Sequence, residues 1–410
     1  MAFPLLRTSI QHAPSRILRP RTGGCAHYHD YIRFATPSGA ARIPLNNPKV
    51  IGLATSRGER SQQEDFYAYV ALSLDPEELR LSLKKAHGLN WDYSTLPPSL
   101  ARQVLFVGIY DGHGGSTVSQ FCRQELHGLF EHVDKSQVPE VFAWAKSLGG
   151  YFRRFHGGVL QPWIRPRAPE ANAKMDLEAR ATLSFFEIDR ILSIEQAAQV
   201  CGATASIVLL QSLDNPVNPF FAATQLALTV AHVGDTRVIL STKEDGRVIP
   251  MTENHHVDAH GEAARLRKTM ARGQAMDSFG EVRWMGALAN TRSLGDLKYK
   301  PFGVTPEPDV RTMLLDGPAY SHITLFSDGV SSVVSDEEVS DLARGAPTPH
   351  YAAQRILRFA EDMGSDDNLT AIVVPLAGWG EMTGEDRTRD LRDYRRRQME
   401  GTERQKARWM

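Results

Sequence analysis

The chain has little cysteine, no long apolar run and almost no net charge, and each absence argues against a class of protein. Its 410 residues include three cysteines, Cys25, Cys122 and Cys201, and no CxxC pair. Neither a disulfide framework nor a zinc–thiolate site is therefore indicated, and a reducing compartment fits best. No apolar run approaches the roughly 20 residues that a membrane-spanning helix needs, so we expect no membrane span. A formal net charge of −1 gives no electrostatic argument for nucleic acid or anionic lipid as a partner.

The two ends of the chain differ in composition from its middle. Residues 1–46 carry six arginines and a single acid, Asp30, which is typical of a mitochondrial presequence; a disordered tail is the alternative. Residues 377–410 mix basic and acidic side chains, and pairs such as Asp393 and Arg397 predict a solvated helix. Binding of this charged tail to RNA or a membrane surface is the alternative. Residues 47–376 show no repeat, so we expect one domain there. We also expect a monomeric protein.

Between these ends, short apolar runs alternate with turns that contain glycine and aspartate. Buried strands are predicted at 104–110, 205–210, 228–233, 322–327 and 370–374, because these runs are rich in strand formers and too short for typical helices. Helices are predicted at 116–132, 180–200, 259–272 and 349–363, where apolar residues recur at spacings of three and four. Segments 75–103 and 133–178 contain many Pro, Gly and aromatic residues, and we interpret them as insertions or loops that shape a substrate surface.

Acidic residues next to small ones follow several of the predicted strands. They occur in Tyr110-Asp111-Gly112-His113-Gly114-Gly115, Gly234-Asp235, Ser327-Asp328-Gly329 and Asp366-Asp367-Asn368. A rigid strand end aims a carboxylate, and a neighbouring glycine lets backbone or ligand approach closely. Mg²⁺ and Mn²⁺ prefer carboxylate, carbonyl and water oxygens. One Asp-Gly pair is more often a turn than a ligand, so the repetition of the pattern is what predicts a metal site.

The order of these motifs resembles that of the metal-dependent protein phosphatases of type 2C, over about residues 50–375. The segments that carry the resemblance are RSQQED (60–65), YDGHGG (110–115), GATA (202–205), VGDTR (233–237), LANTRSLGD (288–296), VTPEPDV (304–310), FSDGV (326–330) and DDNLT (366–370). The resemblance implies an α+β fold, a four-layer α/β/β/α sandwich with two central antiparallel sheets between helices. It also makes residues 47–376 the catalytic domain.

The resemblance implies a protein serine/threonine phosphatase with two Mg²⁺ or Mn²⁺ ions. By this resemblance a metal-bridging water attacks the phosphate of a phosphoserine or phosphothreonine protein directly. Asp111 would bridge the two metals. The other expected metal ligands are Glu64 and the Gly112 carbonyl on one side, Asp328 and Asp367 on the other, and Asp235 at a weaker third site.

The same resemblance assigns three further roles. Arg60 would bind the phosphate, since a planar guanidinium donates two hydrogen bonds to phosphate oxygens. His113 would be the general acid that protonates the departing serine or threonine oxygen, although a hydrogen-bonded loop histidine is the alternative. Asp65 would orient bound water.

Other polar residues of these motifs are interpreted as structural. Asp296 is expected to cap a helix or anchor its loop through Arg292, and Thr204 to support the metal-bearing strands. His255, His256 and His260 are interpreted as a solvated loop, with a transition-metal site as the alternative. Ser331-Ser332 stands where the family usually has Trp-Asp, which puts packing behind the strand in doubt rather than the chemistry.

Two functions from other classes compete with the phosphatase. An adaptor descended from the family would have lost ligands, whereas Glu64, Asp111, Asp328 and Asp367 are all present. A metal-dependent phosphodiesterase or nuclease would need a basic groove, and beyond residues 1–46 only the C-terminal tail offers basic density. With the presequence, the chain looks like the mitochondrial branch of fungal type 2C phosphatases, acting in the matrix. Pyruvate dehydrogenase is then the natural candidate substrate.

Overall fold

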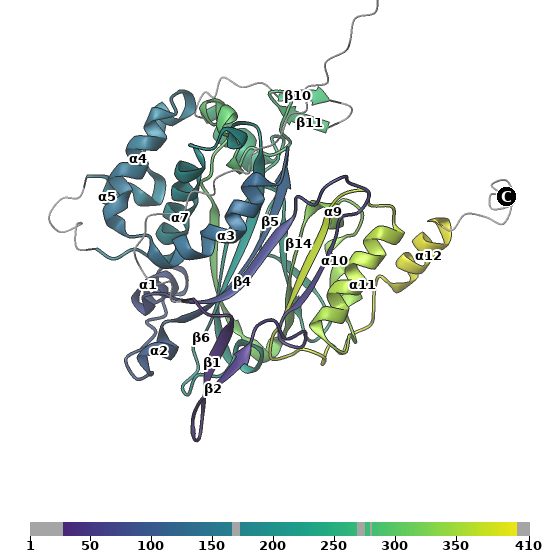
Figure 1. Cartoon of the computed structure of the whole chain (residues 1–410). Coiled ribbons are helices and arrows are strands. Elements are labelled where there is room, and N and C mark those ends of the chain that lie inside the picture. The colour runs from purple at the N-terminus through teal and green to yellow at the C-terminus, as the bar shows by residue number, and fades with distance from the viewer. Residues whose placement is uncertain (1–27, 166–172, 269–274, 279–280, 400–410) are drawn as a thin grey trace, which may run out of the picture.

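Two antiparallel sheets form the centre of the molecule (Figure 1). The structure is a computed structural model that describes residues 28–165, 173–268, 275–278 and 281–399. The first sheet runs in the order β13 (Asp309–Asp316), β7 (Gln225–Val233), β6 (Gly202–Ser212), β5 (Gln103–His113) and β4 (Phe66–Ser73), with β12 (Leu294–Gly295) on β6. The second runs β3 (Gly52–Ser56), β15 (Leu369–Pro375), β14 (Tyr320–Phe326), β8 (Arg237–Thr242) and β9 (Val248–Pro250). The separate hairpins are β1 (Tyr31–Thr36) with β2 (Gly39–Pro44), and β10 (Ala275–Ser278) with β11 (Glu281–Trp284).

Helices cover the outer face of each sheet (Figure 1). On the first sheet lie α1 (Pro76–His87), α2 (Pro98–Ala101), α3 (Thr117–His132) and α7 (Leu177–Leu192), while α4 (Val138–Ser147) and α5 (Gln161–Ile164) pack on the outside of α7. On the second lie α9 (Asp328–Ser331), α10 (Asp336–Ala343) and α11 (Pro349–Asp362), while α12 (Arg389–Met399) packs outside α10 and α11. The helix α8 (His260–Lys268) precedes the β10–β11 hairpin. Short 3₁₀ turns are at Lys135–Gln137, Gly150–Arg154, Gly158–Leu160, Gln196–Gln199, Phe220–Ala222, Leu297–Phe302 and Gly317–Ala319. No described helix is long and apolar enough to cross a bilayer.

Side chains of β5 alternate between two cores, which explains why this strand is apolar on both faces. Phe106 and Tyr110 pack towards α3 and α7, whereas Val107 and Ile109 pack between the two sheets. Successive side chains of a strand point to opposite faces of its sheet, so burial of both faces requires an unbroken apolar run. A third core lies between the second sheet and α10 and α11. The three cores separate four layers, and the predicted α/β/β/α sandwich is confirmed.

Each predicted strand and helix is present, with shifted ends. The predicted helix at 180–200 is α7 followed by a 3₁₀ turn, and α8 covers 260–268 of the predicted 259–272, whose last residues lie outside the described part. The interpretation of 75–103 and 133–178 as loops is wrong, because they contain α1, α2, α4 and α5. Proline breaks a helix in its interior, but Pro76, Pro98 and Pro139 lie in the first turn, where the missing N–H costs no hydrogen bond.

The ends of the folded region also differ from the prediction. Residues 31–44 form the β1–β2 hairpin, and Ile32 and Leu45 are buried, so the folded region begins before residue 47. Residues 1–27, which hold most of the predicted presequence, lie outside the described part. The C-terminal helix is present as α12, but it is not fully solvated: Arg392 is 5% exposed and pairs with Asp386. Residues 400–410 lie outside the described part.

Candidate metal centre and active site

Four acidic residues meet where strands of both sheets end at one edge of the sandwich. Asp111 lies near the C-terminal end of β5, and Asp235 follows β7; both strands belong to the first sheet. Asp328 begins α9 directly after β14, and Asp367 precedes β15, both in the second sheet. Because each side chain is carried by a different strand end, neither sheet alone could assemble the group.

Carboxylate oxygens of Asp111, Asp235 and Asp328 all lie within 4.8 Å of one another. The backbone N–H of Asp328 donates to Asp111 Oδ2 over 3.3 Å, which ties the two sheets together at this point. The three residues line a cavity of about 810 Å³, whose walls also include Glu64, Asp367, Arg60 and His113. The structure therefore brings eight of the nine predicted site residues to one cavity wall: those seven and Gly112.

Burial and mutual repulsion oppose the ionisation of Asp111 and Asp328. Burial, followed by the charges of Asp328, Asp65 and Asp235, raises the pKa of Asp111 well above its usual range. Burial and the charge of Asp235 raise the pKa of Asp328 to about 7. A divalent cation between these oxygens would relieve the repulsion, and an all-oxygen donor set is the one that Mg²⁺ and Mn²⁺ prefer. The residues present thus fit the predicted metals.

Asp65, the ninth predicted residue, lies behind the cavity wall. Its side chain is 4% exposed, and both carboxylate oxygens are buried without a hydrogen bond of good geometry to any described residue. Burial, with a smaller contribution from the charge of Asp367, raises the pKa of Asp65 to about 6. Buried acceptors without partners are rare, and a bound water or metal-bound water would satisfy them. This surrounding fits the predicted role of orienting water.

Gly112 allows two segments to meet at the site. A Cβ atom at this position would lie 2.5 Å from the Glu64 carbonyl oxygen and 2.5 Å from Ser119 Oγ. The Ser119 hydroxyl donates to that carbonyl over 2.6 Å, which fixes Glu64 beside Gly112. Any side chain at residue 112 would separate them, so the DGH sequence needs glycine here for close approach.

Arg60 reaches the cavity from the loop before β4 and contacts Asp367. Its guanidinium Nη2 lies 2.6 Å from Asp367 Oδ2, and the arginine side chain is 57% exposed. The other oxygen of Asp367, Oδ1, accepts from the Asn368 N–H over 2.7 Å. Arg60 is therefore held at the cavity mouth by a predicted metal ligand, with its charge accessible to an incoming anion.

His113 is oriented by Asp296, a contact that the sequence did not predict. His113 Nε2 lies 2.9 Å from Asp296 Oδ2, and Asp296 is 0% exposed. Burial favours the neutral imidazole, but the charge and hydrogen bond of Asp296 outweigh it and raise the pKa of His113. The expected anchoring of Asp296 through Arg292 is wrong, because Arg292 instead pairs with Glu262 and Asp309.

A buried ion pair with α7 fixes the loop that carries Asp296. Lys300 Nζ lies 2.7 Å from Asp189 Oδ2, and both side chains are 0% exposed. Lys300 also donates to the Ser293 carbonyl over 2.6 Å, and Asp189 Oδ1 accepts from the Gly295 N–H over 2.6 Å. Asp189, on α7, thus holds residues 293–300 in place behind His113.

Asp235 is held by two residues whose roles were also missed. His256 Nε2 and Asn290 Nδ2 lie 3.1 Å and 2.7 Å from Asp235 Oδ2. Burial alone would raise the pKa of Asp235, but these two hydrogen bonds outweigh burial, and the pKa is lowered. The interpretation of the histidine cluster as a solvated loop is wrong: His260 is exposed but begins α8, and His255 is 3% exposed and accepts from the Gly234 N–H over 2.9 Å. His255 and His256 pair with Asp309 and Asp235, and the group of described side chains placed to hold a metal includes none of the three histidines.

Two smaller features complete the site. Asn368 Oδ1 accepts a hydrogen bond from the Glu64 N–H over 2.6 Å, and Asn368 Nδ2 donates to the carbonyls of Arg57 and Gln62. These bonds fix the loop that carries Arg60 and Glu64. Thr204 pairs with Asp111 across β5 and β6, as expected of a supporting residue. Ser331 and Ser332, where the sequence departs from the family pattern, line the cavity without replacing a predicted ligand.

Comparison with known proteins gives a consistent result. The family described as protein phosphatase 2C matches residues 77–369. Protein phosphatase 2C homolog 4 of Schizosaccharomyces pombe is 31% identical over 375 residues, covering 89% of this chain and 91% of the relative. The mitochondrial protein phosphatase 1K of Xenopus laevis is 26% identical over 345 residues, covering 83% and 71%. A phosphatase structure from Toxoplasma gondii has the same fold, with a TM-score of 0.52 at 20% identity over 80% of this chain and 95% of that one.

Proposed function

The chain belongs to the protein phosphatase 2C family of protein serine/threonine phosphatases, and we propose that it hydrolyses phosphoserine and phosphothreonine esters at the carboxylate cluster around Asp111. The observation that carries this proposal is the convergence of Asp111, Asp235 and Asp328 within 4.8 Å, from strand ends of both sheets. Such a cluster is costly without a cation, because buried like charges raise one another's pKa.

Glu64, Asp111 and the Gly112 carbonyl would hold one divalent ion, and Asp111, Asp328 and Asp367 the second. Asp235, already held by His256 and Asn290, would contribute to a weaker third site. When bound, Mg²⁺ or Mn²⁺ lowers the pKa of a coordinated water and neutralises charge on the phosphate oxygens. Asp65 would accept a hydrogen bond from water at this site through one of its free carboxylate oxygens.

Arg60 would bind the substrate phosphate. Its 2.6 Å contact with Asp367 competes with this role, since the same carboxylate is a predicted metal ligand. Ligation at Asp367 would release the guanidinium, and its fork geometry would then match two phosphate oxygens. Arg60 would in this way couple metal occupancy to substrate binding.

His113 would donate the proton to the departing serine or threonine oxygen. Asp296 fixes the ring by its 2.9 Å contact with Nε2, which leaves Nδ1 as the atom available to the leaving group. Nearby cations would lower the pKa of His113, and Asp296 counteracts them by raising it. The imidazole therefore stays protonated nearer to neutral pH, as a general acid requires. Asp296 acts here as a positioning residue, because it touches His113 and not the substrate.

Mitochondrial phosphoproteins would be the substrates, with pyruvate dehydrogenase as the candidate. The support is the basic, acid-poor composition of residues 1–46 and the mitochondrial relative from Xenopus laevis. Fusion of residues 1–46 to a fluorescent protein tests the location in cells. Import into mitochondria supports the proposal, and a fusion that stays diffuse while the full chain is also diffuse contradicts it.

The activity itself is tested with phosphoserine, phosphothreonine and phosphotyrosine peptides, in Mn²⁺, Mg²⁺ or EDTA. We expect phosphate release from the first two peptides that stops in EDTA and in Asp111→Asn. Asp258→Asn, an exposed carboxylate on the loop before α8, is the matched control and should retain full activity. Folded, metal-loaded protein that releases phosphate from none of several phosphopeptides would favour the adaptor instead.

A further inference from the structure

A second charged site lies between α11 and α12, on the helical side of the second sheet. The helix α12 lies beside α11, on the side of α11 that faces away from the second sheet (Figure 1). The groove between them has a volume of about 600 Å³, and no described residue lines both this groove and the active-site cavity. Five guanidinium groups line it: Arg355 and Arg358 from α11, and Arg389, Arg392 and Arg396 from α12.

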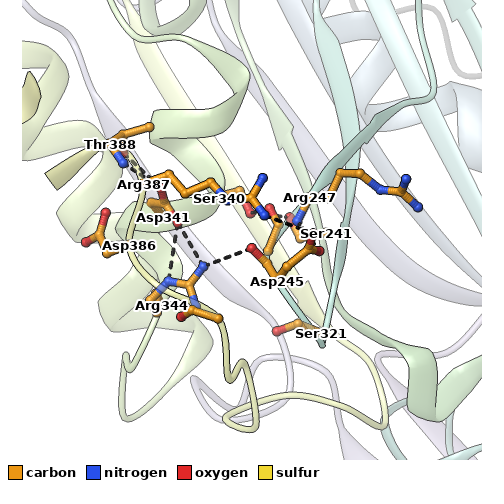
Figure 2. Close-up of polar contacts among 12 residues, drawn as sticks. Ser241, Asp245, Arg247, Ser321, Ser340, Asp341, Arg344, Asp386, Arg387 and Thr388 are labelled. Carbon is orange, nitrogen blue, oxygen red and sulfur yellow. Dashed lines mark hydrogen bonds and ion pairs between the residues drawn. The ribbon is translucent and has the colours of Figure 1, made fainter.

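The α12 wall of this groove is firmly attached to the folded domain. Arg392 is 5% exposed and makes a bidentate pair with Asp386, over 2.6 Å and 3.0 Å. Asp341 of α10 accepts from both the N–H and the hydroxyl of Thr388, over 3.1 Å and 3.0 Å, and from Arg344 (Figure 2). The segment that leads into α12 is therefore anchored to α10 by buried polar contacts.

The groove carries more positive than negative charge. Three carboxylates line it against the five arginines, which leaves a surplus of two positive charges. Asp386 is already used by Arg392, and Asp362 lies 3.6 Å from Arg396. The remaining acid, Asp393, belongs to α12 and is exposed.

Three of the arginines have no acidic partner among the described residues. Arg355 donates to the Arg344 carbonyl over 2.9 Å, whereas no ion pair joins Arg358 or Arg389 to any described carboxylate. Burial, and then the charges of Arg392 and Arg396, outweigh the opposing contributions and lower the pKa of Arg355. The charges of Arg392 and Arg396 therefore oppose that of Arg355 in this groove, and a bound anion would offset the repulsion.

We propose that this groove binds a phosphate-bearing ligand through Arg355, Arg358 and Arg389. A phosphate monoester carries about 1.5 to 2 negative charges at neutral pH and accepts bidentate hydrogen bonds from guanidinium, which matches both the surplus charge and the donor geometry. Asp362 and Asp393 among the arginines would repel a long polyanion, so the site fits a single phosphate group better than RNA or an anionic membrane. The phosphate could come from a phosphorylated protein segment or from a small phosphate ester.

Calorimetric titration of the full chain in EDTA tests the proposal, because turnover is then absent and the carboxylates at Asp111 repel phosphate. The ligands are a phosphothreonine peptide, its unphosphorylated form, inorganic phosphate and an RNA oligonucleotide. We expect the phosphopeptide or inorganic phosphate to bind, and tighter binding of the peptide would identify a protein source. Arg358→Gln and Arg389→Gln should each weaken binding roughly tenfold.

Arg397→Gln is the matched control, since Arg397 is an exposed arginine of α12 that does not line the groove. It should bind as the wild type does. Metal-dependent turnover of a short phosphopeptide should be unchanged in all three variants, which separates this site from the active site and verifies folding. Equal binding by Arg358→Gln, Arg389→Gln and wild type would overturn the proposal. Equal binding of the unphosphorylated peptide, or tighter binding of RNA, would also overturn it.

Discussion

Replacing Lys300 by methionine should destabilise the protein strongly, because it leaves the Asp189 carboxylate buried without its cation. Lys300 Nζ lies 2.7 Å from Asp189 Oδ2, and neither side chain is exposed. Removing one partner of a buried ion pair costs about 3–5 kcal/mol, a large fraction of the roughly 5–15 kcal/mol that stabilises a typical domain. We therefore expect Lys300→Met to lose about 3–5 kcal/mol in urea unfolding, measured in EDTA to exclude metal binding.

Two further variants decide whether the unpaired charge is the cause. Asp189→Asn combined with Lys300→Met removes both charges and keeps an acceptor for the Gly295 N–H, so the loss should fall to about 1–2 kcal/mol. Lys298→Met changes an exposed lysine of the same segment and should stay within about 0.5 kcal/mol of wild type. The reasoning is refuted if the double variant is no more stable than Lys300→Met, or if Lys300→Met unfolds like Lys298→Met.

Three other predictions follow from the titrating groups. Asp296→Asn removes the charge that raises the pKa of His113, so the alkaline limb of the pH–rate profile should move to lower pH; an unchanged limb would exclude His113 as the acid. In the metal-free protein the pKa values of Asp65 and Asp328, about 6 and about 7, exceed their unfolded values, so the native state binds extra protons. Its stability should fall as pH rises from about 4 to 7, and Mn²⁺ should reverse the loss; urea midpoints that rise over this window would contradict this. Burial raises the pKa of Glu262, but two arginines outweigh it and lower it to about 2. Stability should therefore be lost as pH falls from about 4 towards 2, and Glu262→Gln should flatten this part of the unfolding curve; equal slopes would contradict it.

The sequence predicted β5, β6, β7, β14 and β15 because their signal is local, but it did not predict β4 and β13 of the first sheet or β3, β8 and β9 of the second. The run from Val104 to Tyr110 is apolar on both faces, and only a buried strand or a short buried helix produces such a run. The helices at 76–87 and 138–147 were missed because proline was counted against them. Asp75 caps the first helix by accepting from the Glu77 N–H, and an acid followed by proline is a helix start signal that was available in the sequence.

The predicted metal ligands met in one cavity because each stands beside its own strand end, and the order of the motifs placed them. The groups that position them could not be found in this way. Asp296 contacts His113 across 183 residues of sequence, and Asn290 reaches Asp235 across 55. Such contacts depend on the path of the loops between strands. Periodicity and local motifs carry no information about this path. The depth of burial of His255 was misjudged for the same reason.

The most direct test of the account is to measure bound Mn²⁺ and phosphatase activity on the same metal-free sample as Mn²⁺ is added. Wild-type protein should bind at least two ions, and phosphothreonine hydrolysis should rise with their occupancy. Asp111→Asn, which changes the predicted bridging ligand, should lose both the tightly bound ions and the activity while remaining folded. Hydrolysis that persists in metal-free protein, or Asp111→Asn protein that binds Mn²⁺ and turns over like wild type, would contradict the account.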